Sequence, residues 1–379
     1  MKGRHGGRRA GAAIASSVLI LLVGACGGHS APNALRAPRA VTTTTTSTTA
    51  RRPAASAPPV HTKSAGRKPA LRADPTPLCP LTGLRPPGGK VPQRAALAVK
   101  VENLPQARPQ WGLDKTDIVF EEPVEGGITR FIAVFQCQSA SRIEPVRSAR
   151  LVDPKILEPL GRMLIAYSGA IQPAIDEIDS RTSLLSDLSA NKVGSAYWRD
   201  PDRYAPHNLA TSTSALYAAA ATMGYREKPP TPIFSYGRPV LGGTPAAAVD
   251  IHYQLDTATW TWHRDTGLWY RYYSDTGPAM QGDGVQISAS NVVIMLVHEH
   301  PTPWPEDDTG ALENDLALKG SGPAWVFRDG TVFYGHWERP LLDHPAVFID
   351  EKSGAVITLT PGNTWEELVP FALGVSVEP

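Results

Sequence analysis

The segment VKVENLPQARPQWGLDKTDIVFEEPVEGGITRFIAVFQCQSASRIEPVRSAR, residues 99–150, contains two apolar runs separated by a glutamate-rich turn. The runs 117–122 and 130–137 are typical of β-strands, and Gly126-Gly127 between them favours a hairpin with a longer loop. Both faces of each run are apolar, so we expect both strands to lie in the interior of a sheet. The strand ends beside the turn then carry ionisable side chains: Glu121, Glu122 and Arg130.

Around this hairpin the sequence predicts an α+β protein with two folded domains. In residues 77–228, strand-like runs alternate with short helical runs, which indicates an N-terminal mixed α/β domain. The expected elements are strands at 95–101 and 163–167, and helices at 154–160, at 172–178 and in the alanine-rich run that ends at Met223. Asp153 is expected to cap the first of these helices, and Thr211 or Ser212 the last.

Residues 229–379 form the second predicted domain, which begins with a proline-rich break. Its runs alternate as strands do and are joined by short turns, so we expect a β-rich fold. The expected strands are 249–255, 259–264, 268–273, 291–298, 324–328, 332–337, 346–350 and 356–360. Near the C-terminus, Thr364 is expected to cap a terminal turn through Trp365, Glu366 and Glu367.

Seven tryptophans lie in this second part of the chain: Trp260, Trp262, Trp269, Trp304, Trp325, Trp337 and Trp365. Aromatic rings of this kind suit either a carbohydrate-binding platform or packing in the core and across strands. We favour packing, because it is the commoner use of tryptophan in β-rich domains.

Residues 1–26 predict a lipoprotein signal peptide. A positive n-region precedes the apolar run 12–23, which is too short to span a bilayer. Small residues precede Cys26, as in the lipobox at which bacterial signal peptidase cleaves and a diacylglycerol is attached. We therefore expect a lipid anchor to the cell membrane, on its extracytoplasmic face. The alternative is an ordinary signal peptide with an incidental cysteine.

Residues 27–76 are rich in Pro, Ala, Thr and Arg and poor in large apolar residues, so we expect a disordered tether. Residues 1–74 contain 12 Lys and Arg and one acid, a net charge of +11. Residues 75–379 contain 25 Lys and Arg against 35 acids, a net charge of −10. An acidic body argues against nucleic acid as a partner.

Cys79 and Cys137 remain once Cys26 is assigned to the lipid. In an oxidising compartment we expect them to form a disulfide. The bond would join residues 58 positions apart and stabilise the folded state by roughly 4 kcal/mol in the chain-entropy model. Two separate buried thiols are the alternative.

Glutamates and arginines around the hairpin form the main candidate site. Paired carboxylates can divide into an acid and a base or nucleophile, as glycoside hydrolysis requires. Arginines can hold a phosphate or carboxylate in a bidentate fork. The predicted ligand-binding residues are Arg108, Glu121, Glu125, Arg130, Arg147, Arg150, Arg203, His207 and Asn208, and the catalytic candidates are Glu121, Glu125 and His207. The alternative is a structural ion-pair network at strand ends.

His298 and His300 share one face of a predicted strand, and acidic residues follow from Glu306 onward. No third ligand stands at a recognised interval, so we predict neither a metal site nor a cofactor. A serine-hydrolase elbow, a Walker loop and a Rossmann fingerprint are absent from the sequence.

Five motifs in the body point to a known family. They are ARPQWGLDKTDIVFEEPVEGGITRFIAVF (107–135), PVRSAR (145–150), PHNL (206–209), GSGPAWVFRDGTVFYGHW (320–337) and LTPGNTWEELVP (359–370). Together they resemble the YerB-like family of bacterial lipoproteins, a two-part family whose biochemical function is not established. The resemblance implies a membrane-tethered extracytoplasmic protein with a mixed N-terminal and a β-rich C-terminal domain. It brings no catalytic residues.

Three functions are compatible with these features. The first is a lipoprotein that binds an anionic or glycan component of the cell envelope, such as a wall polymer. The second is an envelope hydrolase or transferase acting on a glycosidic or phosphodiester bond. The third is a structural partner of another envelope protein, which would use the tryptophan-rich domain. We favour binding, because no catalytic motif is recognisable.

Overall fold

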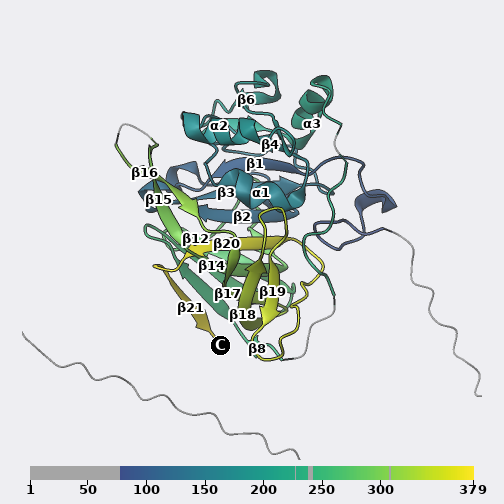
Figure 1. The fold of residues 1–379 in the computed structure, drawn as a ribbon, viewed down its shortest axis with the longest axis vertical. Helices are drawn as coiled ribbons and strands as arrows, with labels where there is room; N and C mark the ends of the chain where they lie inside the picture. The colour runs from purple at the N-terminus through teal and green to yellow at the C-terminus, as the bar shows by residue number, and fades with distance from the viewer. Residues whose placement is uncertain (1–76, 227, 238–241, 307–308) are drawn as a thin grey trace, which may run out of the picture. The chain divides into compact units, whose positions relative to one another are not determined.

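The computed structural model describes residues 77–226, 228–237, 242–306 and 309–379. The predicted signal peptide, Cys26 and the tether lie outside these residues, so those expectations stay predictions. The described part is rich in strands, and its few helices all lie between residues 87 and 222 (Figure 1). No helix in these described ranges is long and apolar enough to cross a bilayer.

The larger sheet contains β1 (Leu97–Glu102), β2 (Ile118–Pro123), β3 (Thr129–Phe135), β4 (Met163–Ala166), β5 (Leu185–Asp187), β8 (Thr244–Pro245), β14 (Asn291–Val297), β17 (Gly320–Arg328), β18 (Thr331–Arg339), β19 (Val347–Asp350) and β20 (Thr364–Pro370). Its order is β19-β18-β17-β14-β20-β2-β3-β1-β4-β5, with β8 beside β18. Strands from both predicted domains therefore pair within one sheet.

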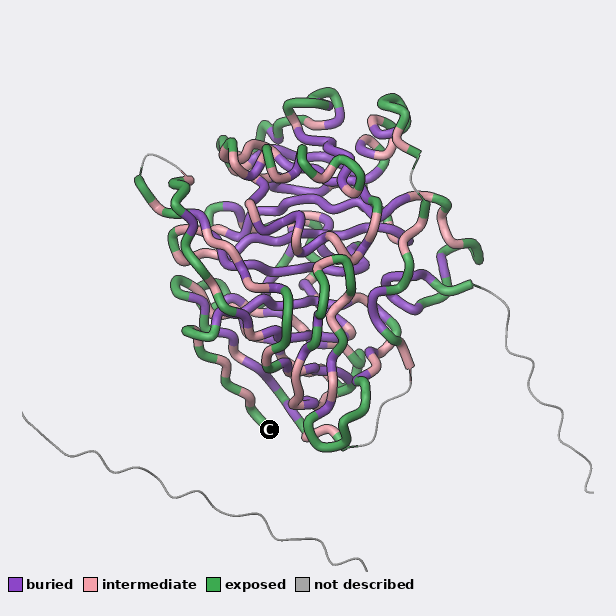
Figure 2. The backbone as a smooth tube through the Cα atoms, viewed as in Figure 1, coloured by how far each residue is buried: buried purple, intermediate pink, exposed green. Residues whose placement is uncertain are grey.

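The hairpin predicted from the opening segment is confirmed. Strands β2 and β3 pair antiparallel, with Ile118 opposite Val134 and Glu122 opposite Arg130. Each also has a second neighbour, β20 for β2 and β1 for β3, so both are interior strands as expected. Every residue of β2 and β3 is buried, and Figure 2 shows buried backbone running through the middle of the molecule.

The prediction of a capped turn at Thr364 was wrong. Residues Thr364–Pro370 form β20, which lies between β14 and β2 and is parallel to both. Two glutamates in succession resemble a helix start in the sequence, but hydrogen bonds to a strand on either side decide the conformation here. This strand connects the two segments of the chain.

A smaller sheet contains β9 (Ala248–His252), β10 (Thr257–His263), β11 (Leu268–Tyr273), β12 (Gly277–Pro278), β13 (Ser288–Ala289) and β21 (Gly374–Glu378). Its order is β12-β11-β10-β9-β21, with β13 beside β11. The pairs β6 (Tyr197–Arg199) with β7 (Leu209–Thr211) and β15 (Glu299–Pro305) with β16 (Leu312–Leu316) stand apart from both sheets.

Tryptophans fill the space between the two sheets. The rings of Trp260 on β10 and Trp365 on β20 lie 5.1 Å apart, and Phe131 on β3 also contacts Trp365 at 5.1 Å. Trp269 is fully buried with them. These contacts confirm core packing for the buried tryptophans and leave Trp304 as an exposed exception.

The helices are short. They are α1 (Asp153–Leu157), α2 (Gln172–Ser180) and α3 (Thr213–Thr222), with 3-10 turns η1 (Pro87–Gly89), η2 (Pro105–Ala107), η3 (Leu113–Lys115), η4 (Glu125–Gly127), η5 (Glu158–Leu160) and η6 (Gly194–Ala196). Figure 1 shows α2 and α3 at the end of the molecule near β4.

Of the two helix caps predicted here, one is confirmed and one is wrong. Ser212 caps α3, because its hydroxyl accepts a hydrogen bond from the Ala215 N–H at 3.1 Å. Asp153 does not cap α1. It is the first helical residue, and its carboxylate instead binds Lys100 and the backbone N–H of Arg150.

Cys79 and Cys137 form the predicted disulfide. The strand expected at 356–360 is not formed, because Val356 and Leu359 make only isolated bridges, to Ile349 and Tyr236.

Glu366 on β20 provides a test of the central strand. Burial raises the pKa of Glu366 to about 7, with Arg339 opposing part of that effect. A carboxyl whose folded pKa is raised holds its proton longer in the folded protein, so stability falls as pH rises from about 4.5 to 7. We expect Glu366→Gln to remove this contribution, which is roughly 3 kcal/mol.

The measurement is urea-induced unfolding of both proteins at pH 4.5 and pH 8. The free energy of unfolding of the wild type, relative to the variant, should fall between the two pH values. Identical pH dependence in the two proteins would contradict the buried position of Glu366.

Candidate functional site

The bend between β2 and β3 presents Glu125. Gly126 and Gly127 adopt φ values of 74° and 76°, a region that side-chain-bearing residues rarely adopt. A Cβ on Gly127 would also lie 2.5 Å from the side-chain oxygen of Gln254. The glycine pair therefore allows a tight bend that packs against the β9–β10 turn and turns Glu125 toward the segment after β3.

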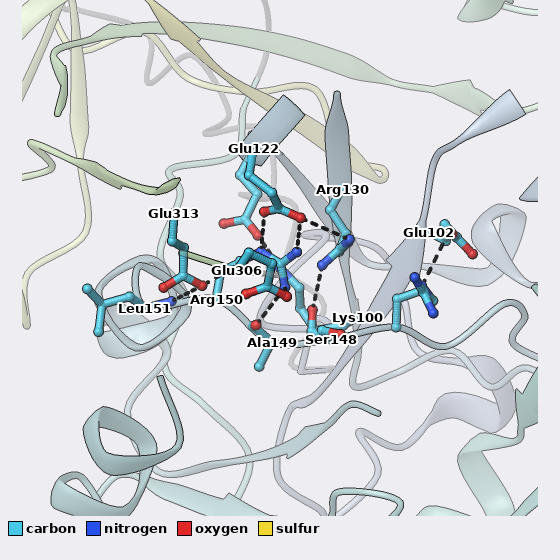
Figure 3. Close-up of polar contacts among 12 residues, drawn as sticks. Lys100, Glu102, Glu122, Arg130, Ser148, Ala149, Arg150, Leu151, Glu306 and Glu313 are labelled. Atoms are coloured by element: carbon cyan, nitrogen blue, oxygen red, sulfur yellow. Dashed lines mark hydrogen bonds and ion pairs between the residues drawn. The ribbon is translucent and has the colours of Figure 1, made fainter. Parts of the chain in front are cut away.

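Glu125 holds Arg150 in a bidentate ion pair, with Nε to Oε2 at 2.7 Å. Two further carboxylates approach the same guanidinium, Glu306 at 3.0 Å and Glu313 at 3.7 Å (Figure 3). Burial alone would raise the pKa of Glu125, but the hydrogen bond and charge of Arg150 outweigh it and hold that pKa below its ordinary value. Glu125 is therefore a poor general acid.

Arg130, at the start of β3, lies beside this pair. Its guanidinium donates to the backbone oxygen of Ser148 at 3.1 Å, while the nearest oxygen of Glu125 is 3.9 Å away. Burial, together with the neighbouring charges of Arg150 and Arg147, lowers the pKa of Arg130 to about 10, although Glu125 and Glu102 oppose this shift. A buried cation thus stands next to two other cations without a close carboxylate of its own.

Arg147 and His207 share a fourth carboxylate, that of Glu102. Glu102 lies at the end of β1, and its carboxylate is 3.3 Å from Arg147 Nε. The same carboxylate forms a hydrogen bond with His207 Nδ1 at 2.9 Å. The side chains of Arg147 and His207 are 25% and 23% exposed, whereas that of Glu102 is buried. Solvent therefore reaches Arg147 and His207, whereas Arg130 and Arg150 are buried. We call Arg130, Arg147, Arg150 and His207 the arginine cluster.

A buried triad lies beneath the cluster. Lys100 on β1 pairs with Glu122 on β2 and with Asp153 on α1, the latter at 2.8 Å. Burial and the nearby charge of Asp153 raise the pKa of Glu122 to about 8 despite Lys100. The triad ties β1, β2 and α1 together and fixes the backbone that carries Arg150.

Glu121 does not belong to the arginine cluster. Successive residues of a strand face opposite sides of a sheet, so Glu121 points toward the smaller sheet while Glu122 points away. There Glu121 binds Arg271 at 2.8 Å, and Arg271 also pairs with Glu367 at 3.1 Å. All three side chains are buried, so Glu121 lacks the solvent access that a ligand-binding or catalytic residue requires.

Three other predicted residues lie in separate networks. Arg108 pairs with Asp256 and Asp275 and stacks on the Tyr273 ring at 3.5 Å. Arg203 binds the backbone oxygens of Ala107 and Pro109 and lies 3.5 Å from Glu144. Asn208 donates to the backbone oxygens of Asp200 and Arg203 and so braces its own loop.

A cavity of about 220 Å³ opens beside the bend. Glu125 lines it together with Tyr253, Glu299 and Leu312, but neither Arg147 nor Arg150 is among its lining residues. This cavity is therefore not shared by the bend and these two arginines. Glu125, Arg130 and Arg150 converge, but Arg147 and His207 reach solvent on another side.

Glu306, Glu313 and Lys100 were not predicted as site residues. Glu306 and Glu313 lie more than 150 positions after the hairpin, and the pairing of β15 with β16 brings them back to Arg150. In the ranges that the structure describes, no group of three or more potential metal ligands is found.

Comparison with known proteins shows which family the chain belongs to. Residues 81–226 match the family model described as "Protein of unknown function (DUF3048) N-terminal domain", and residues 249–365 match the corresponding C-terminal domain model. The chain belongs to the DUF3048 family. Residues 227–248 separate the two matched ranges.

Two comparisons concern one relative of this DUF3048 protein. The chain is 29% identical over 297 residues to "Putative lipoprotein YerB" of Bacillus subtilis, covering 77% of this chain and 86% of the relative. It also matches the crystal structure of YerB from Bacillus subtilis with a TM-score of 0.67 and 26% identity, covering 79% of this chain and 99% of that one.

Arg150 and Arg147 allow a matched test of the DUF3048 site. Arg150→Ala leaves three buried or nearly buried carboxylates without their cation, so we expect a loss of about 3–5 kcal/mol in the free energy of unfolding. Arg147→Ala removes a partly exposed side chain and should cost less than about 1 kcal/mol. Urea unfolding followed by tryptophan fluorescence measures both, and equal losses would refute the division into a structural and an accessible arginine.

Proposed function

We propose that this protein is a membrane-anchored extracytoplasmic lipoprotein that binds an anionic component of the cell envelope at the arginine cluster. Arg147 and His207 are the contacts on the solvent side, and Arg130 supplies positive charge from behind them. The ligand group is a phosphate or carboxylate, the two groups that arginine binds in bidentate geometry.

The state of Arg130 is the observation that carries this proposal. A buried guanidinium with two like-charged neighbours and its nearest carboxylate oxygen at 3.9 Å costs free energy. An anion held at Arg147 would offset that cost. Arg150, by contrast, already has Glu125 and Glu306 as close partners and has little charge left for a ligand.

The anchor is supported by the signal-peptide pattern that ends at Cys26 and by the name of the relative, which is a lipoprotein name. The disulfide of Cys79 with Cys137 is in keeping with a position outside the cytoplasm.

An anionic ligand is favoured over a neutral glycan. A sugar platform needs exposed aromatic faces, whereas Trp260, Trp269 and Trp365 are buried between the sheets. The same burial weakens a role as a structural partner that uses these tryptophans.

Hydrolysis of a phosphodiester is the second candidate, and one observation favours it. The buried carboxylate of Glu102 orients the His207 ring through Nδ1, and His207 Nε2 has no hydrogen-bonding partner in the described part of the chain. A histidine oriented in this way can act as a general base.

The main test measures the melting temperature of the mature chain, residues 26–379 with Cys26→Ser, against three polymers. These are poly(glycerol phosphate), polygalacturonate and neutral dextran. We expect an anionic polymer to raise the melting temperature by roughly 2–5 °C at saturation, because ligand binding stabilises the folded state. Arg147→Ala should abolish this rise and dextran should cause none.

Arg264→Ala is the matched control, since Arg264 is an exposed arginine outside the arginine cluster. A rise that survives in Arg147→Ala as fully as in Arg264→Ala would refute the proposed site. Release of glycerol phosphate during the same incubation, lost in His207→Gln, would favour the hydrolase instead.

The anchor has its own test. Mass spectrometry of the protein purified from bacterial membranes should find a mature N-terminus at Cys26 that carries a diacylglycerol. Cys26→Ala should lack that modification. A mature N-terminus at another residue would contradict the lipoprotein assignment and leave the arginine cluster untouched.

A further inference from the structure

A second concentration of positive charge lies away from the arginine cluster. A cavity of about 460 Å³ is lined by Leu160, Gly161, Arg162, Arg226, Lys228, Pro229, Pro230 and Thr231. Three of these residues are cations, and no Asp or Glu is among the lining residues that the structure describes. We call this cavity the basic hollow.

The cations of the basic hollow are in contact with solvent. Arg162, Arg226 and Lys228 are all exposed. Arg226 and Lys228 form no ion pair or hydrogen bond in the described part of the chain, unlike Arg147 and Arg150, which are paired with carboxylates. In the sequence, Glu227 stands between Arg226 and Lys228, so these three residues and Arg162 carry a net charge of +2. The body as a whole, residues 75–379, carries −10.

The segment that follows the basic hollow packs against the first residues of the described chain. The chain runs from Lys228 to Tyr236, and the Tyr236 hydroxyl donates to the backbone oxygen of Leu81. Gly83 also packs against the Tyr236 ring. Figure 1 shows α3, which precedes the basic hollow in the chain, on the same right-hand side of the view as the start of the described chain.

We propose that the basic hollow docks on the anionic lipid headgroups of the membrane that holds the tether. Headgroup phosphates attract Lys and Arg near the surface, and each such residue increases partitioning roughly fivefold. The acidic remainder of the body is repelled by the same surface, so charge selects this face. The lipid anchor keeps the body within reach and raises the effective concentration.

This inference rests on the proposed anchor for its biological setting, but its physical test does not need the anchor. The unlipidated mature chain, residues 26–379 with Cys26→Ser, is mixed with vesicles of phosphatidylcholine alone or with 30% phosphatidylglycerol, and sedimentation gives the partition coefficient. We expect Arg226→Gln with Lys228→Gln to lower partitioning onto the anionic vesicles on the order of 25-fold. Neither protein should bind the neutral vesicles.

The matched control is Lys319→Gln with Lys352→Gln, which removes the same two charges from exposed lysines outside the basic hollow. It should change partitioning by less than about twofold at physiological salt. Both double variants keep the basic tether, so their difference reports on the body alone.

Equal partitioning of the two double variants would overturn the proposal, because the tether would then account for all binding. Loss of vesicle binding on adding millimolar inorganic phosphate would also overturn it in favour of a free-anion site. Neither outcome depends on Arg147, so failure here is distinct from failure of the arginine cluster.

Discussion

Strand β20 enters the larger sheet between β14 and β2 and runs parallel to both. Parallel neighbours cannot be joined by a hairpin, so each of these pairings closes a long stretch of chain. Trp365 on this strand fills the space between the two sheets, and Glu367 receives Arg271 from the smaller sheet. The hairpin β2–β3, the bend that carries Glu125 and the buried network of Glu121 all depend on β20 being in place.

The arginine cluster shows how burial separates residues of one chemical type. Arg147 and Arg150 are three positions apart in the sequence, yet one is partly exposed and the other is buried among carboxylates. Burying a charge without partners costs several kcal/mol, so Arg150 is fixed by Glu125, Glu306 and Glu313. Arg130 has less compensation than Arg150. An uneven distribution of counter-charge, rather than the number of arginines, is what distinguishes a binding position from a structural one.

The sequence predicted the parts of the fold that depend on local pattern. Apolar runs on either side of Gly126-Gly127 predicted β2 and β3, and alternation predicted most strands of residues 249–337. The position of Ser212 before an apolar run predicted the cap of α3. The local pattern missed β20, because the adjacent glutamates 366 and 367 depend on a partner strand at each side and on the nearby cations Arg339 and Arg271. It missed Glu306 and Glu313 for the same reason, since their proximity to Arg150 is created by tertiary pairing.

In the candidate site, too, local pattern predicted some features and tertiary pairing created the others. Glu125, Arg130 and Arg150 were grouped in one candidate site, and the structure brings their side chains together. Glu121 was grouped with Glu125, although side-chain alternation along β2 sends Glu121 and Glu122 to opposite faces of the sheet. Arg108 and Arg203 lie on loops whose course no local pattern fixes.

The position of β20 also bears on biogenesis. The sheet cannot close around β2 until residue 364 is available, because β2 and β14 are bridged only by this strand. A chain that is threaded N-terminus first through a membrane channel would therefore stay without its central pairing until nearly its whole length had passed. In an exported chain, such late closure would postpone the central sheet pairings until residues 364–370 had left the channel.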